Sequence, residues 1–175
     1  MDQRSSRYVT CTMGKLTQKP HKKVTHIQAK RPLGLLHMDL CGPMPVRSLG
    51  GAKYLYAIVD EYSKYVDAYT IKNKAETFEC FKEYLNIYEN ELGSKIKRVR
   101  SDNGREFVNS EFEDLFRAKG IRHQKTIPYN PQSNGVAERT NRSILEKTRT
   151  MLIDAELPES FCHDGNTFEK LISNK

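Results

Sequence analysis

The sequence predicts an α/β fold in which a mixed five-stranded sheet is flanked by helices. Three strand-like segments, residues 35–40, 54–59 and 65–71, follow one another with short turns between them, which indicates an antiparallel meander. Two more, residues 95–100 and 122–127, are each preceded by a helical segment, which predicts strands added in parallel. No internal repeat is visible, so one mixed sheet is expected.

The three strands of the meander differ in character. The run from Tyr54 to Val59 is almost continuously apolar, as is typical of a central strand buried on both faces. Gly42-Pro43 stops the first strand, and the third is rich in the aromatic and β-branched residues that favour strands. We therefore expect the second strand to lie inside the sheet.

The first predicted helix lies between the meander and the fourth strand. Asn73 and Glu76 are spaced as a capping box, and Gly93 suits the C-terminal end. Apolar residues recur at helical spacing between them and predict the buried face: Phe78, Phe81, Leu85, Tyr88 and Leu92.

Two further helices are predicted. A second capping box, Ser110 with Glu113, opens a short helix that ends at Gly120 and buries Phe112, Leu115 and Phe116. After a loop at residues 128–135, a long helix begins at Val136. Its expected apolar face consists of Ile144, Leu145, Thr148, Met151, Leu152 and Ala155.

Charge and composition divide the chain into a basic arm (1–32), a core (33–160) and a C-terminal segment without periodicity (161–175). The arm carries eight Lys or Arg and one acid, which accounts for the whole net charge of +7 and suits either a polyanion contact or a solvated tail. The longest apolar run is far shorter than the roughly 20 residues of a membrane span, so a membrane protein is not expected. The four cysteines form no CxxC pair and are expected as reduced thiols.

Three carboxylates lie where predicted elements end or begin. Asp39 closes the first strand, Asp102 follows the fourth, and Glu138 lies in the first turn of the long helix. Each alone has an ordinary explanation: a strand-end acid, a turn residue, or a complement to the helix dipole. Asp60, Glu61 and Asp67 also lie near strand ends, and spacing alone does not exclude them.

Together, the first three carboxylates predict a metal site. If the first and fourth strands lie side by side and parallel, their C-terminal ends share one edge, and the long helix can bring Glu138 beside both aspartates. Hard oxygen ligands without a His or Cys partner suit Mg²⁺ or Mn²⁺. Two such ions about 3.5–4 Å apart support in-line displacement at phosphorus.

Three ordered motifs resemble the catalytic core of retroviral-type integrases, and most of all the integrase region of Copia-type retrotransposon polyproteins. The motifs are residues 36–43 (LHMDLCGP), 100–107 (RSDNGREF) and 128–142 (PYNPQSNGVAERTNR). The 35 residues between Asp102 and Glu138 match the spacing of that family, and the 62 between Asp39 and Asp102 lie within its range.

The resemblance implies a ribonuclease-H-like fold and a metal-binding catalytic triad of Asp39, Asp102 and Glu138. It implies a polynucleotidyl transferase with Mg²⁺ or Mn²⁺, two ions per site, that joins the DNA ends of the element to target DNA by attack of a 3′-hydroxyl. It also implies a homodimer or higher multimer that acts in the nucleus or a virus-like particle.

The residues around Glu138 predict contacts with DNA. Arg139, Arg142 and Arg149 recur, with Glu146, at spacings of three and four on one helix stripe, which is otherwise typical of a solvated face. Asn141 and the loop residues Gln132, Ser133 and Asn134 are candidates for sugar or base contacts.

The chain departs from the family before and after the core. Cys11 matches the end of the N-terminal zinc module of the family, but Tyr8 stands where its partner cysteine belongs, so no structural zinc is predicted. Phe161-Cys162 replaces the usual Phe-Trp. An inactive transposon-derived relic that binds nucleic acid therefore stays open, and a ribonuclease-H-type nuclease is a weaker alternative.

Overall fold

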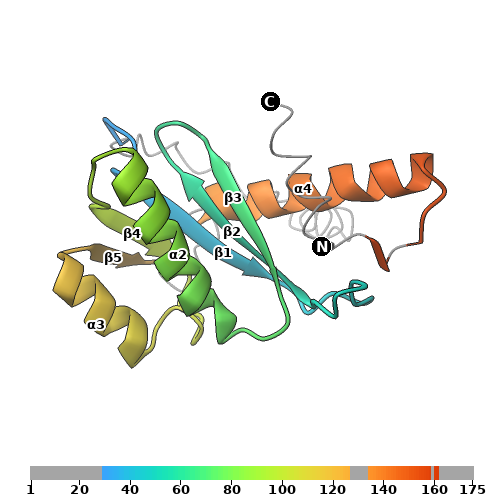
Figure 1. Cartoon of the computed structure of the whole chain (residues 1–175), viewed down its shortest axis with the longest axis horizontal. Helices are drawn as coiled ribbons and strands as arrows, with labels where there is room; N and C mark the ends of the chain where they lie inside the picture. Colours follow the sequence, from blue (N-terminus) through green and yellow to red (C-terminus); the bar gives the residue numbers. More distant parts are fainter. Residues whose placement is uncertain (1–28, 127–133, 159, 162–175) are drawn as a thin grey trace, which may run out of the picture.

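The computed structural model describes residues 29–126, 134–158 and 160–161. In this part of the chain one five-stranded sheet has the order β3-β2-β1-β4-β5, with helices on both of its faces (Figure 1). The elements, in chain order, are β1 (Leu36–Cys41), β2 (Tyr54–Asp60), β3 (Val66–Ile71), α2 (Glu76–Glu91), β4 (Arg98–Ser101), α3 (Ser110–Lys119), β5 (Arg122–Lys125) and α4 (Gly135–Asp154).

The strand directions confirm the predicted topology. β1, β2 and β3 pair antiparallel as a meander, whereas β4 pairs parallel with β1, and β5 parallel with β4. β2 is buried over almost its whole length, as its apolar run predicts. Because β1 and β4 are parallel neighbours, their C-terminal ends lie at the same edge of the sheet. Asp39 and Asp102 therefore lie at that edge.

The main core lies between the sheet and the helices α2 and α3. Leu36 and Met38 of β1 point into it, together with Phe81 of α2 and Phe112 and Phe116 of α3. Phe112 contacts Phe81 and Phe116 with ring centroids 5.6 and 5.5 Å apart. The predicted burial of Phe112 and Phe116 is therefore confirmed. Leu92, at the end of the first predicted helix, was also expected to be buried but is 48% exposed.

The opposite face of the sheet is covered by α4, which packs against β1 and β2. Its predicted apolar face is only partly correct: Ile144, Thr148 and Leu152 are buried, but Met151 is 45% exposed. The buried stripe instead runs back through Asn141 and Ala137 toward the N-terminus of the helix. The far end of α4 extends past the sheet (Figure 1), and in its last turn Leu152 is buried whereas Met151 and Ile153 are exposed.

Two predicted helix starts need correction. Asn109, not Ser110, caps α3, because its Oδ1 accepts a hydrogen bond from Phe112 N at 3.1 Å. The Asn73 side chain does not cap α2, although Glu76 Oε1 accepts from Asn73 N at 2.8 Å as the acidic half of a capping box would. The predicted end of α3 is confirmed by Gly120, whose φ of 69° closes the helix in the left-handed conformation.

The strands β4 and β5 are shorter than the segments predicted for them, and α4 begins one residue earlier than predicted. Cys41 and Cys80 are half-buried free thiols, as expected. Among the described helices, none has the length and apolar character needed to cross a membrane.

Candidate active site

Asp39 lies near the C-terminal end of β1, on the face of the sheet that α4 covers. Its partner across the antiparallel pair is Ala57, and the side chains of β1 alternate, so Met38 points into the core and Asp39 points the other way. Asp39 is half-buried there. The strand thus presents the carboxylate to the first turns of α4.

Two asparagines hold this carboxylate. Asn141 Nδ2 donates to Asp39 Oδ2 at 2.8 Å, and Asn134 Nδ2 donates to Met38 O at 3.0 Å and lies 3.4 Å from Asp39 Oδ1. Both asparagines are 2% exposed, and their own amide oxygens are buried without a hydrogen-bond partner among the described residues. A buried oxygen without a hydrogen-bond partner costs free energy of folding. The two asparagines therefore serve to position Asp39 rather than to stabilise the fold.

Asp102 stands where β4 turns toward α3. Its Oδ1 accepts a hydrogen bond from Gly104 N at 3.0 Å, and the side chain is exposed. A Cβ on Gly104 would lie 3.0 Å from that oxygen and 2.7 Å from the Glu106 carboxyl carbon, so glycine here lets both side chains approach the turn closely. Lys74 Nζ forms an ion pair with Glu106 at 3.2 Å and ties the turn to the residues that precede α2.

Glu138 lies in the first turn of α4 and is exposed. Since Asn134 precedes this helix and Asn141 follows one turn after Glu138, the hydrogen bonds to Asp39 fix the N-terminus of α4 over the end of β1. These contacts place the start of the helix that carries Glu138 beside the strand end that carries Asp39.

The pKa of Asp39 depends in part on the charges of Asp102 and Glu138. The pKa of Asp39 is raised from 3.8 to about 6, chiefly by burial; the hydrogen bond from Asn141 opposes this shift, and the negative charges of Asp102 and Glu138 add to it. Mutual repulsion of three carboxylates is the electrostatic situation that a bound cation relieves.

The donor set fits a hard divalent cation, because it consists of carboxylates without a thiol or imidazole. In the described part of the chain, however, no group of three or more His, Cys, Asp or Glu side chains is arranged to hold an ion. Asp39 is engaged by Asn141 and Asp102 by Gly104 N–H. To bind an ion, Asp39 would therefore give up its hydrogen bond from Asn141, and Asp102 would give up its hydrogen bond from Gly104 N–H.

The structure also separates the acids that spacing had left open. Asp60 pairs with Leu36 at the opposite end of β1, where its two oxygens accept from Leu33 N and from Ser63. Glu61 follows Asp60 and contacts His37 Nε2 at 2.7 Å. Asp67 lies on β3 and accepts hydrogen bonds from the hydroxyls of Tyr69 and Tyr88 at 2.9 and 3.2 Å. These three carboxylates have structural partners away from Asp39.

The predicted DNA-contact residues fall into three groups. Arg139, Arg142 and Arg149 are exposed on α4, as a role in phosphate binding requires. Asn134 and Asn141 are buried against Asp39, so neither faces solvent in this structure. Gln132 and Ser133 lie outside the described residues.

Sequence reasoning missed the role of the two asparagines toward Asp39 and the part of Lys74 and Glu106 in the Asp102 turn. The spacing of Asn134 and Asn141 was a signal, because residues seven positions apart lie two turns apart on the same side of a helix. The pairing of Lys74 with Glu106, 32 residues away, has no comparable signal.

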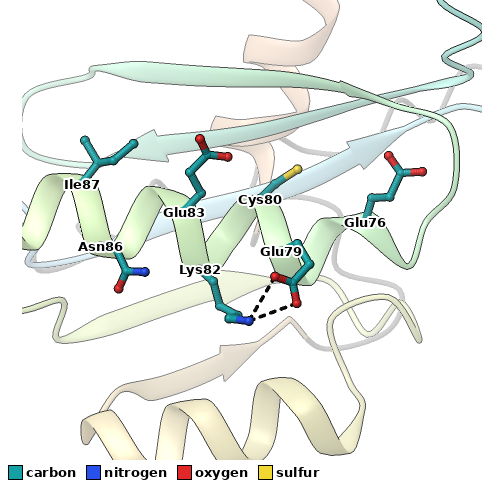
Figure 2. Close-up of a pocket in the computed structure, with 7 residues that line it drawn as sticks. All are labelled: Glu76, Glu79, Cys80, Lys82, Glu83, Asn86 and Ile87. Carbon is teal, nitrogen blue, oxygen red and sulfur yellow. Dashed lines mark hydrogen bonds and ion pairs between the residues drawn. The ribbon is translucent and has the colours of Figure 1, made fainter.

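A separate hollow lies on the outer surface of α2, on the other face of the sheet from Asp39 (Figure 2). Three glutamates line it, with Cys80 and Lys82 between them, and Lys82 Nζ pairs with Glu79 at 3.0 Å. None of the predicted site residues takes part in it.

Solved structures identify the class of fold. The chain resembles one chain of the simian T-cell lymphotropic virus intasome in complex with PP2A regulatory subunit B56 gamma, with a TM-score of 0.62 and 26% identity over 81% of this chain and 47% of that chain. It also resembles the HTLV-2 integrase catalytic core domain in complex with magnesium, with a TM-score of 0.58 and 23% identity over 83% of this chain and 87% of that chain. Integrase catalytic cores have a ribonuclease-H-like fold, so the predicted fold class is confirmed.

The family follows from sequence comparison. The integrase core domain model matches residues 29–131, and the chain belongs to this family. It is 44% identical over 146 residues to the retrovirus-related Pol polyprotein from transposon TNT 1-94 of Nicotiana tabacum, and 32% identical over 151 residues to that from transposon RE1 of Arabidopsis thaliana. The matches cover 82% and 86% of this chain but only 11% and 10% of the polyproteins. The resemblance to retrotransposon integrase cores is thus confirmed.

Proposed function

We propose that this chain is the catalytic core of a Copia-type retrotransposon integrase, which joins the DNA ends of the element to target DNA by metal-dependent polynucleotidyl transfer. The observation that supports the proposal is the hydrogen bond from Asn141 to Asp39, which holds the start of the helix that carries Glu138 beside the end of β1. The negative charges of Asp102 and Glu138 raise the pKa of Asp39, as expected for carboxylates that face a common position.

The reaction is an exchange of phosphodiesters. The 3′-hydroxyl oxygen of the donor end bonds to a target phosphorus, the bond from that phosphorus to the target 3′-oxygen breaks, and one proton passes from the attacking to the leaving oxygen. No net oxidation occurs and no nucleotide is consumed. Asp39, Asp102 and Glu138 would hold the divalent cations, which would supply activation of the attacking oxygen and stabilisation of the leaving one.

The other residues of the site orient and bind. Asn141 holds Asp39 Oδ2 at 2.8 Å and keeps the carboxylate turned toward α4. Gly104 N–H holds Asp102 at 3.0 Å within its turn. The exposed guanidinium groups of Arg139, Arg142 and Arg149 are suited to hold DNA phosphates beside Glu138.

Disintegration of branched DNA in Mn²⁺ tests the proposal, because this reversal of joining makes the smallest demand on regions outside the core. Asp102→Asn should lower the rate at least about a hundredfold, equivalent to about 2.7 kcal/mol of transition-state stabilisation. Asp114→Asn is the matched control, since Asp114 is exposed on α3 and paired with Arg117. Circular dichroism and thermal melting should show the same fold for all three chains.

The alternative is a catalytically silent relic that binds nucleic acid. It prevails if the unmodified chain shows no metal-dependent joining or disintegration where a control integrase does. The titles of the solved relatives name an intasome and a dimeric form. We accordingly propose DNA as the partner, a dimer or higher multimer as the working form, and the nucleus or a virus-like particle as the place of action.

A further inference from the structure

A second basic surface lies on the strands β4 and β5, apart from the arginines of α4. Arg98 pairs with Arg122 across these strands, and Arg100 pairs with Gln124. Arg100 is also the neighbour of His37 on β1, whereas Val99, between the two β4 arginines, points into the core. Arg98, Arg100, Arg122 and Gln124 therefore share the face of the sheet that carries Asp39. We call them the sheet arginine patch.

The positive charge of this patch is only partly offset by the described residues: Glu61, which contacts His37, lies near enough for its negative charge to act on Arg100. Arg98 Nε donates to Gly34 O at 3.3 Å, and Arg100 donates to Gln124 Oε1 at 3.2 and 2.8 Å; both acceptors are uncharged. Within the described segments, none of the three arginines forms an ion pair. Like charges directly opposite one another on neighbouring strands are destabilising. Folding thus assembles a repulsive cluster that an anionic partner would stabilise.

The patch lies to one side of α4, the described helix that packs on this face of the sheet. α4 packs against β1 and β2, and Figure 1 shows it running away from β4 and β5. Arg122 is exposed, and Arg98 and Arg100 are half-buried.

The patch also leads into the proposed active site. Arg100 precedes Asp102 by two residues of the same chain segment, which corresponds to about 7 Å along a strand. Arg98 lies a further two residues back. A polyanion that reaches the carboxylate edge would therefore extend over the patch without a turn.

We propose that the sheet arginine patch binds the phosphate backbone of DNA and guides the duplex toward the edge formed by Asp39 and Asp102. Arginine favours phosphate because its planar fork donates two parallel hydrogen bonds to one phosphate group. The inference deepens the proposed function, since it names the surface along which the substrate of that site lies.

The test is DNA binding by the full chain in EDTA, measured as fluorescence anisotropy of a labelled duplex of arbitrary sequence over a range of salt concentrations. The variant is Arg98→Gln with Arg122→Gln, which leaves the contact between Arg100 and Gln124 intact. The control is Arg117→Gln with Lys119→Gln on α3, which removes the same charge from the opposite side of the sheet.

We expect the patch variant to raise the Kd at least about fivefold near 0.1 M salt and to reduce the slope of log Kd against log salt by about one to two. The control should change the Kd less than about twofold. Melting temperatures of the patch variant should equal or exceed those of the unmodified chain, because a repulsion is removed.

Equal losses of affinity in both double variants, or none in the patch variant, would overturn the proposal and leave an acidic protein surface as the better partner for the patch. Since the assay needs no metal ion, its outcome is independent of catalysis. Loss of disintegration with intact DNA binding would contradict the proposed enzyme and not the patch.

Discussion

Asn141 of α4 donates a hydrogen bond to Asp39 of β1 at 2.8 Å, across 102 residues of chain. The bond joins the helix that carries Glu138 to the strand that carries the first carboxylate. Because Asn141 is 2% exposed and its amide oxygen has no hydrogen-bond partner among the described residues, this contact serves Asp39 rather than solvent. It is the clearest physical link between the two halves of the site.

Removing this donor should disturb the carboxylate more than the fold. In Asn141→Leu, the pKa of Asp39 should rise above its value of about 6, because the bond that lowers it is lost. The free energy of unfolding should fall by about 1–3 kcal/mol at neutral pH, since a buried charge loses its partner. Carboxyl-carbon NMR titration measures the pKa, and an unchanged value would contradict the assignment.

Asp39 itself should make stability depend on pH in an unusual direction. Its folded pKa of about 6 lies above the unfolded value of 3.8, so the folded chain binds more protons between these values and this contribution to stability is lost as pH rises through that window. Asp39→Asn should therefore match the unmodified chain near pH 4 and exceed its stability by on the order of 1–2 kcal/mol above pH 6.

Urea unfolding in EDTA at several pH values measures this difference. His123 acts in the opposite sense, because burial lowers its pKa to about 4, but both chains share it and it cancels in the comparison. A stability gain that is the same at every pH would show that Asp39 does not carry the shifted pKa.

Gly104→Ala should separate activity from stability. The new Cβ would meet the Glu106 carboxyl at 2.7 Å and Asp102 Oδ1 at 3.0 Å. The Glu106 side chain can swing away at small cost, so we expect a loss of stability below about 1 kcal/mol. Displacement of Asp102 should lower disintegration activity at least about tenfold.

The control is Gly50→Ala, where the nearest atom to the added Cβ is Ser48 Oγ at 3.7 Å. That variant should keep both the activity and the melting temperature of the unmodified chain. If Gly104→Ala retains full activity, the close approach of Glu106 and Asp102 has no part in the chemistry.

Asp60→Asn should show the reverse pattern. The two oxygens of Asp60 accept from Leu33 N at 3.0 Å and from Ser63 N and Oγ at 2.7 Å, and the residue is 3% exposed. An amide nitrogen in place of one oxygen would face a donor, at a cost of about 1–3 kcal/mol. Thermal melting should record the loss, while disintegration per folded molecule stays unchanged; a specific loss of activity would assign Asp60 to the site.

The fold was predictable because its signals are local. The apolar run at Tyr54–Val59 and the helices between later strands determine which strands are central and which are parallel, and the sheet order agrees. Element boundaries were predicted less accurately. Asn109 caps α3 in place of Ser110, because the side chain of either neighbouring residue could accept a hydrogen bond from a backbone N–H of the first helical turn. The buried face of α4 was misplaced because the helix turns Ala137 and Asn141 toward the sheet and Met151 toward solvent.

The sequence by itself determined the family, the antiparallel meander with its parallel additions, and the three acidic candidates, because motif spacing and hydrophobic periodicity are properties of neighbouring residues. Tertiary structure alone decided that Asn134 and Asn141 turn inward to Asp39, that Asp60 and Glu61 lie at the far end of β1, and that three arginines meet on β4 and β5. These relationships depend on strand register and helix rotation, which arise only when distant segments pack.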